Sequence, residues 1–260
     1  MPQEEREASG EWLYAGKSAL NMYGNFFYWL FREPFPGRQI GQQIVRVMLE
    51  AFGVLMITAV VEGMLFSWLG GWNSAKFSLV TWDGAAVVYL LLTESTTLIG
   101  AMIFAARIGT AFTVEIGSMQ MSGQLDALRL MAIEPVQYIV IPRVLASILS
   151  LVILKALGDG VAILTALLTS RWWFGISFTI FLQHVWALLR SPILTTAYIR
   201  SAILAFIIAM NGCGLGFYFN GGAAELGRTT TKSIVLNLIV AISVDSLYGV
   251  IDSLMGWSTV

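Results

Sequence analysis

Five long apolar runs constrain the fold of this chain more than any other feature of its sequence. Each run reaches the roughly twenty residues that a helix needs to cross the hydrocarbon of a bilayer. Helices are the expected spanning form, because unpaired backbone groups are costly in lipid and the chain lacks the short alternating segments of a barrel. The expected spans are residues 45–69, 84–106, 139–168, 193–219 and 233–255.

The composition supports a membrane protein and argues against other classes. Apolar residues make up 57% of the chain and charged residues 12%, whereas soluble domains have about 25% charged residues. The formal net charge of -1 leaves no electrostatic footprint for nucleic-acid binding. We therefore expect an all-α integral membrane protein that forms a single domain over residues 1–260.

The distribution of Lys and Arg predicts the orientation of the spans. With the N-terminus in the cytoplasm, only Lys76, Arg171 and Arg190 fall on the outer side. The inner side then holds nine basic residues: Arg6, Lys17, Arg32, Arg38, Arg107, Arg129, Arg143, Arg228 and Lys232. This bias predicts a cytoplasmic N-terminus and a C-terminus on the opposite side.

Residues 11–33 are rich in aromatic side chains, but Lys17 and two asparagines interrupt the apolar pattern. This pattern favours a helix lying in the membrane interface over a sixth span. A partly buried span is the alternative.

A polar stretch at residues 115–135 separates the second and third runs. Its composition is compatible with a helix, and we expect one over residues 113–133. In a membrane protein, a short structured helix between two spans usually contacts something in water. The predicted orientation places this helix in the cytoplasm.

Several ionisable residues fall within the predicted spans, where charge is costly and is a functional candidate by default. Lys155 and Asp159 are spaced i and i+4, so they can pair on one helix face. Such groups either fix helix packing as ion pairs or serve a transport path, and a proton relay is a further option. The full set is Glu50, Glu62, Glu94, Lys155, Asp159, Arg200, Asp245 and Asp252.

The motifs of common enzymes are missing from the sequence. The glycines follow no strand and precede no GK[ST] motif, which excludes the phosphate-loop interpretation. Cys213 has no Cys or His at metal-ligand spacing. His184 has no nucleophile beside it in the sequence and is expected to be an interfacial residue. We expect no enzyme active site in this chain.

Two sequence blocks resemble the MlaE/YrbE family of permeases. The first contains ARIGTAFTVEIGSM at residues 106–119, QLDAL at 124–128, Met131, EP at 134–135 and PR at 142–143. The second is NGGAAELGRTTTK at residues 220–232, similar to that family's loop before the last span. The resemblance covers the chain length, the five spans and the interfacial helix.

The resemblance implies the membrane subunit of an ABC transporter that moves phospholipids between the bacterial inner membrane and the outer envelope. It implies a second copy of the chain, a dimer of cytoplasmic ATPase subunits that binds ATP and Mg²⁺, and a ring of MCE-domain proteins on the outer, periplasmic side. A STAS-domain protein joins some such systems. No cofactor is expected in this chain itself.

The resemblance also implies functional residues. The polar stretch becomes a coupling helix that docks into a groove on the ATPase. Its candidate polar contacts are Glu115, Gln124, Asp126 and Arg129, and its packing face is Ile116, Met119, Leu125 and Leu128. A helix lying on the protein's own inner surface is the alternative.

The family's lipid cavity lies between two permease copies, opens outward and is mostly apolar with a few placed charges. Its candidate polar residues here are Glu94, Arg200, Arg228 and Asp245, and Arg200 can meet a phosphate or balance Asp245 or Glu94. Its candidate apolar wall is Leu65, Val87, Leu90, Leu91, Leu98 and Tyr248.

Two other functions remain open at this stage. An ion-coupled secondary transporter would use Glu94 and Asp245 as carriers, and such transporters often show internal repeats. No repeat is visible in this sequence. A membrane scaffold without a substrate would have no outward apolar cavity.

Overall fold

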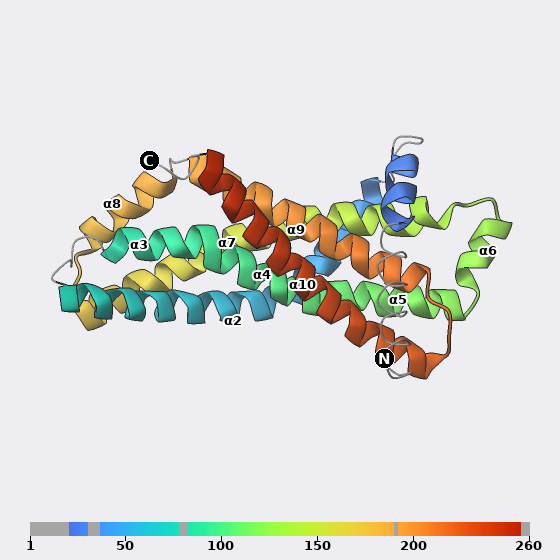
Figure 1. Cartoon of the computed structure of the whole chain (residues 1–260), viewed down its shortest axis with the longest axis horizontal. Helices are drawn as coiled ribbons and strands as arrows, with labels where there is room; N and C mark the ends of the chain where they lie inside the picture. Colours follow the sequence, from blue (N-terminus) through green and yellow to red (C-terminus); the bar gives the residue numbers. More distant parts are fainter. Residues whose placement is uncertain (1–20, 31–36, 78–82, 190–191, 256–260) are drawn as a thin grey trace, which may run out of the picture. The chain divides into compact units, whose positions relative to one another are not determined.

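The computed structural model describes residues 21–30, 37–77, 83–189 and 192–255. These residues form helices joined by short turns, and no strand occurs among them, which confirms the all-α prediction. Figure 1 shows the helices in sequence colours. The long helices are α2 (Gly37–Phe77), α7 (Ile141–Phe174), α9 (Pro192–Phe217) and α10 (Ala223–Met255). The shorter ones are α3 (Asp83–Leu90), α4 (Thr96–Phe104), α5 (Thr110–Met121), α6 (Gln124–Leu130) and α8 (Phe178–Leu189).

Within the described residues, three one-turn π-helical segments interrupt the α-helices, and none of them was predicted. They are η1 (Leu91–Ser95), η2 (Ala105–Gly109) and η3 (Val136–Val140). The segments η1 and η2 join α3, α4 and α5 into one continuous span, and η3 leads into α7. A π-turn bonds each N–H to the carbonyl five residues back, so it leaves carbonyls without their usual helical partners.

Five helices of the described chain are long and apolar enough to cross a membrane, as predicted. They cover Gly37–Trp72, Val87–Met121, Val136–Phe174, Leu194–Phe217 and Ala223–Ile251. The last of these begins before the predicted residue 233, so most of the expected loop at 220–232 is helical. The helix α8, between the third and fourth spans, was also not predicted, and it contains His184.

The single helix predicted over residues 113–133 is wrong. The second span continues as α5 to Met121, and the separate helix α6 covers only Gln124–Leu130. Between them Gly123 has φ +71, a left-handed conformation that favours glycine. Ile108, Phe112 and Ile116, spaced four residues apart, are all buried. This apolar stripe carries the span through the polar stretch as far as the glycine turn.

The chain divides into two compact units, which are described separately. Unit 1 contains residues 1–47, 104–148 and 205–241, and unit 2 contains residues 48–103, 149–204 and 242–260.

In unit 1, the end of η2 and α9 approach so closely that only glycine fits at their contact. A Cβ atom on Gly212 would lie 2.5 Å from the carbonyl oxygen of Gly109. Beside this contact, Thr113 Oγ1 lies 3.1 Å from the Gly212 carbonyl oxygen and 2.8 Å from Ser233 Oγ on α10. The small residues therefore let a hydroxyl link three helices, as is common in membrane bundles.

Residues 21–30 form a helix that packs on α9 within unit 1. Phe26 is buried and meets the Phe206 ring edge-on at 5.6 Å between centroids. Tyr23 donates a hydrogen bond to Asn211 at 3.2 Å, and burial raises the pKa of Tyr23 to about 12, so the hydroxyl keeps its proton. This segment belongs to the predicted interfacial helix at 11–33, whose other residues lie outside the described part of the chain.

In unit 2, α3 and α8 lie side by side (Figure 1). Val88 and Leu91 of the second span pack with Phe181 and Val185 of α8 in one buried cluster that also includes Ala162 of α7. The hydroxyl of Ser67 on α2 lies 2.7 Å from that of Ser170 on α7. This packing holds η1 inside unit 2, next to the ionisable residues of the third and fourth spans.

Candidate functional site

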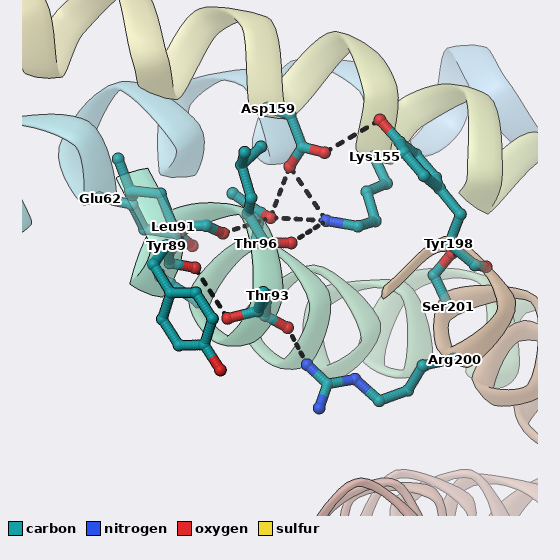
Figure 2. A network of polar contacts seen from close by, with 12 residues as sticks. Glu62, Tyr89, Leu91, Thr93, Thr96, Lys155, Asp159, Tyr198, Arg200 and Ser201 are labelled. Atoms are coloured by element: carbon teal, nitrogen blue, oxygen red, sulfur yellow. Dashed lines mark hydrogen bonds and ion pairs between the residues drawn. The ribbon is translucent and has the colours of Figure 1, made fainter. Parts of the chain in front are cut away.

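The segment η1 lies beside a buried network of polar and charged side chains in unit 2 (Figure 2). The Thr96 N–H reaches back five residues to the Leu91 carbonyl. The next two carbonyls accept hydrogen bonds from side chains instead. Lys155 Nζ donates to the Leu92 carbonyl at 2.9 Å, and Arg200 Nη2 donates to the Thr93 carbonyl. The π-turn thus supplies acceptors to one cation from α7 and one from α9.

The predicted pair of Lys155 and Asp159 is confirmed, and their nitrogen and oxygen are 3.0 Å apart. Both side chains are buried, with 1% and 5% exposed. Thr96 Oγ1 lies 2.9 Å from Lys155 Nζ and 2.6 Å from Asp159 Oδ1, while the Tyr198 hydroxyl donates to Asp159 Oδ2 at 3.1 Å. Because each charge has an opposite charge and further hydrogen bonds, this pair is a well-satisfied structural element of unit 2.

Arg200 forms the second ionic group, with one carboxylate on each side. It lies 3.3 Å from Glu94 and 3.2 Å from Asp245, the two partners that the sequence suggested for it. Its guanidinium also lies over the ring of Tyr248, 5.6 Å from the centroid. Three spans therefore meet at this arginine.

The exposure of the three charged side chains differs sharply. Arg200 and Asp245 are buried, with 4% and 7% of their side chains exposed, but the Glu94 side chain is 49% exposed. Glu94 is the one residue of η1 that is not buried. The π-turn therefore presents a carboxylate at the surface of unit 2 and holds an arginine directly behind it.

The predicted apolar wall residues fall into different surroundings. Val87 and Leu91 belong to the buried core of unit 2, with exposures of 2% and 0%. Leu90 is 40% exposed, and Leu98 is half-buried. Leu65 instead lines an apolar pocket of about 340 Å³ with Val61, Met64, Trp68, Thr169 and Trp173. Arg228 lies in unit 1 at the start of α10, exposed and 3.9 Å from Glu225.

The predicted coupling residues separate into a buried group and an exposed group, both in unit 1. Ile116 and Leu125 are fully buried, so their side chains belong to the interior of unit 1. Met119 and Leu128 are half-buried. Glu115 accepts a hydrogen bond from Arg143 at 3.0 Å and pairs with Arg46, so it links α5 with α7 and α2.

The exposed polar side chains of α6 are Gln124, Asp126 and Arg129. Asp126 and Arg129 pair at 2.8 Å, and the Arg129 guanidinium lies over the Phe217 ring at 5.6 Å. Sequence reasoning missed Leu130 and Met131, which are 90% and 62% exposed at the end of this helix. Leu130 follows the buried Leu125 by five residues and therefore lies on the opposite face, a phase difference that is visible in the sequence.

Comparison with known proteins agrees with the membrane architecture. Residues 40–251 match the family model described as Permease MlaE. The chain belongs to the MlaE permease family.

Three relatives illustrate the breadth of that family. A Synechocystis protein described as a probable ABC transporter permease is 30% identical over 90% of this chain and 89% of its own length. An Arabidopsis thaliana protein named TRIGALACTOSYLDIACYLGLYCEROL 1, chloroplastic, is 28% identical over 92% of this chain and 70% of its own length. A Rickettsia typhi protein, also described as a probable ABC transporter permease, is 25% identical over 77% of this chain and 78% of its own length. The chain is thus a multi-pass membrane permease.

Proposed function

We propose that this chain is the membrane subunit of an ABC transporter that moves phospholipids between the inner membrane and the outer envelope. Its membership of the MlaE permease family and the description of its Synechocystis relative support the transporter class. The name of the Arabidopsis relative contains a glycolipid, which supports a lipid as cargo. ATP and Mg²⁺ bind to a separate ATPase, and this chain carries the path.

The observation that carries the lipid assignment is the half-exposed Glu94 in front of the buried Arg200. Charged side chains within a span are costly and mark substrate paths in many transporters. A phospholipid combines an anionic phosphate with acyl chains, so its path needs an arginine within largely apolar surroundings. We propose that the headgroup meets Glu94 and Arg200, while Asp245 keeps the arginine neutralised when no lipid is present.

For energy coupling, we propose that α6 docks into a groove on the ATPase through its exposed side chains. Gln124, Asp126 and Arg129 supply polar contacts, and Leu130 and Met131 supply exposed apolar surface. An exposed apolar side chain at a helix end suits a helix-in-groove contact. Glu115, Ile116 and Leu125 act behind this surface, where they link or pack the helices of unit 1.

The remaining assembly is proposed on the family pattern. Two copies of the chain enclose an outward-open lipid cavity, an ATPase dimer binds on the cytoplasmic side, and a ring of MCE-domain proteins exchanges lipid on the periplasmic side. A STAS-domain protein is an additional partner. The orientation has the N-terminus in the cytoplasm, in line with the distribution of Lys and Arg.

The test is transport of a fluorescent phospholipid in proteoliposomes that contain this chain, its ATPase and its MCE protein. Arg200→Gln removes the buried charge that the headgroup would meet, and we expect the ATP-dependent rate to fall at least tenfold. Arg107→Gln, an exposed arginine on η2, is the matched control and should keep the wild-type rate. An unchanged rate in Arg200→Gln would reduce the cluster to structural ion pairs. Transport driven by a proton gradient without ATP would favour the ion-coupled alternative.

A further inference from the structure

Arg143, at the beginning of α7, is buried but only partly satisfied. Its side chain is 5% exposed, and its Nη2 donates to Glu115 at 3.0 Å. The Nε and Nη1 atoms have no hydrogen-bond partner within the described part of the chain. A guanidinium presents five N–H donors in a fixed plane, and leaving buried donors of a charged group unmet is costly. This arginine therefore keeps two unmet donors among the described residues.

A polar pocket of about 300 Å³ lies against this arginine in unit 1. Three glutamines of α2 line it, Gln39, Gln42 and Gln43, together with Tyr138 of η3 and Arg143. The Gln43 Oε1 atom is also buried without a hydrogen-bond partner among the described residues. The volume is that of a small-molecule site, and several polar groups converge on it.

The charges around Arg143 favour an anion. Glu115 is shared between Arg143 and Arg46, so one carboxylate faces two guanidinium groups and this triad has a net charge of about +1. Arg143 is the only charged residue that lines the described pocket. A guanidinium forms strong charge-assisted hydrogen bonds with phosphate oxygens, and the glutamine amides add further donors.

The position of the pocket along the spans indicates where the phosphate comes from. Gln39 and Gln43 lie near the beginning of the first span, Met119 near the end of the second, and Tyr138 and Arg143 near the beginning of the third. At a rise of about 1.5 Å per residue, all of them lie within roughly 10 Å of a span end. The first span alone has 36 residues, a length of about 54 Å that exceeds a bilayer with its headgroups. The pocket therefore lies at headgroup depth.

We propose that this pocket, formed by α2, α5, η3 and α7, binds the phosphate of a phospholipid headgroup in the leaflet on the α6 side of the membrane. The guanidinium of Arg143 binds the phosphate, and the glutamines hold the rest of the headgroup. Tyr138, which is 47% exposed, borders the opening. This site is separate from Arg200 and its carboxylates and does not depend on the transport activity.

The experiment is native mass spectrometry of the delipidated full-length chain, titrated with dimyristoyl phosphatidylglycerol. Dimyristoylglycerol, which has the same acyl chains and no phosphate, is the parallel probe. We expect Arg143→Gln to weaken the first phosphatidylglycerol binding event by about tenfold or more, because it removes charge-assisted hydrogen bonds. Arg143→Lys should weaken it by a similar factor, since an ammonium keeps the charge but loses the planar fork.

Arg107→Gln is the matched control, because it removes an exposed arginine of unit 1 that does not line the pocket. It should bind phosphatidylglycerol like the wild-type chain. Should Arg143→Gln not fold, Gln43→Leu tests the same pocket without touching the triad and should weaken binding several-fold. Equal affinity for the two lipids, or wild-type binding by both Arg143→Lys and Gln43→Leu, would overturn the proposal. Displacement of the lipid by millimolar inorganic phosphate would assign the pocket to a soluble phosphate and overturn the lipid source.

Discussion

The contact between the second span and α9 differs between units 1 and 2. In unit 1, η2 and α9 touch through bare backbone at Gly109 and Gly212, with one threonine hydroxyl beside the contact. In unit 2, α7 and α9 reach the second span with the long cationic side chains of Lys155 and Arg200, which bind carbonyls of η1. The glycine contact is too close for the two helices to shift against each other. Long side chains that bind the carbonyls of a π-turn can exchange their hydrogen-bond partners. This difference supports our proposal that the lipid path runs through unit 2.

The largest expected effect is in unit 2. Lys155→Met leaves Asp159 without its buried cation, and breaking such a pair costs about 3–5 kcal/mol. The thermal unfolding midpoint of the purified protein should fall accordingly. The double variant Lys155→Met with Asp159→Leu removes both charges and should recover most of the loss. A single variant as stable as the wild type would mean that the pair does not hold α7 to η1.

The next effect is in unit 1. Gly212→Ala places a Cβ atom 2.5 Å from the Gly109 carbonyl oxygen, a backbone atom that has no rotamer to change. Overpacking of this kind costs about 1–3 kcal/mol. The control is Gly227→Ala on α10, where no atom lies within 4 Å of the new Cβ. Denaturation in detergent should show a loss for the first variant, and for the second a gain of up to about 1 kcal/mol from helix propensity.

The smallest effects should be equal in the two units. Thr113→Val removes the hydroxyl beside Ser233 in unit 1, and Ser67→Ala removes the hydroxyl beside Ser170 in unit 2. Hydrogen bonds between membrane helices average about 0.6 kcal/mol, so each variant should unfold close to the wild type. A much larger loss in Thr113→Val alone would show that the hydroxyl, and not the glycine contact, joins the helices of unit 1.

The sequence predicted the spans and the pair of Lys155 and Asp159 well because both follow from local spacing. Lys155 and Asp159 are one helical turn apart. The partners of Arg200 were suggested only by the resemblance to the MlaE/YrbE family. The ends of the elements were predicted less well. The second span continues past Glu115 because Ile108, Phe112 and Ile116 keep it buried, and such tertiary burial has no separate signal in a polar stretch.

The π-turns account for most of the site contacts that were not predicted from the sequence. Leu92 and Thr93 act through their backbone carbonyls, and the type of a residue does not reveal whether its backbone binds a side chain. Thr96 and Tyr198 were likewise not expected to touch Asp159, because their contacts join residues that are distant in sequence. The cluster of hydroxyl residues around Glu94 in the middle of an apolar run was the available hint.

The extra residue in η1 changes which way the side chains of the second span point. Each helical residue turns the chain by about 100°, so one added residue rotates all side chains beyond Ser95 by that angle relative to an uninterrupted helix. A helix face that is exposed to lipid before η1 therefore does not continue as the lipid-exposed face after η1. Removing Thr93 would restore regular winding and swing Glu94 around the helix axis, away from Arg200, while leaving the composition of the span nearly untouched.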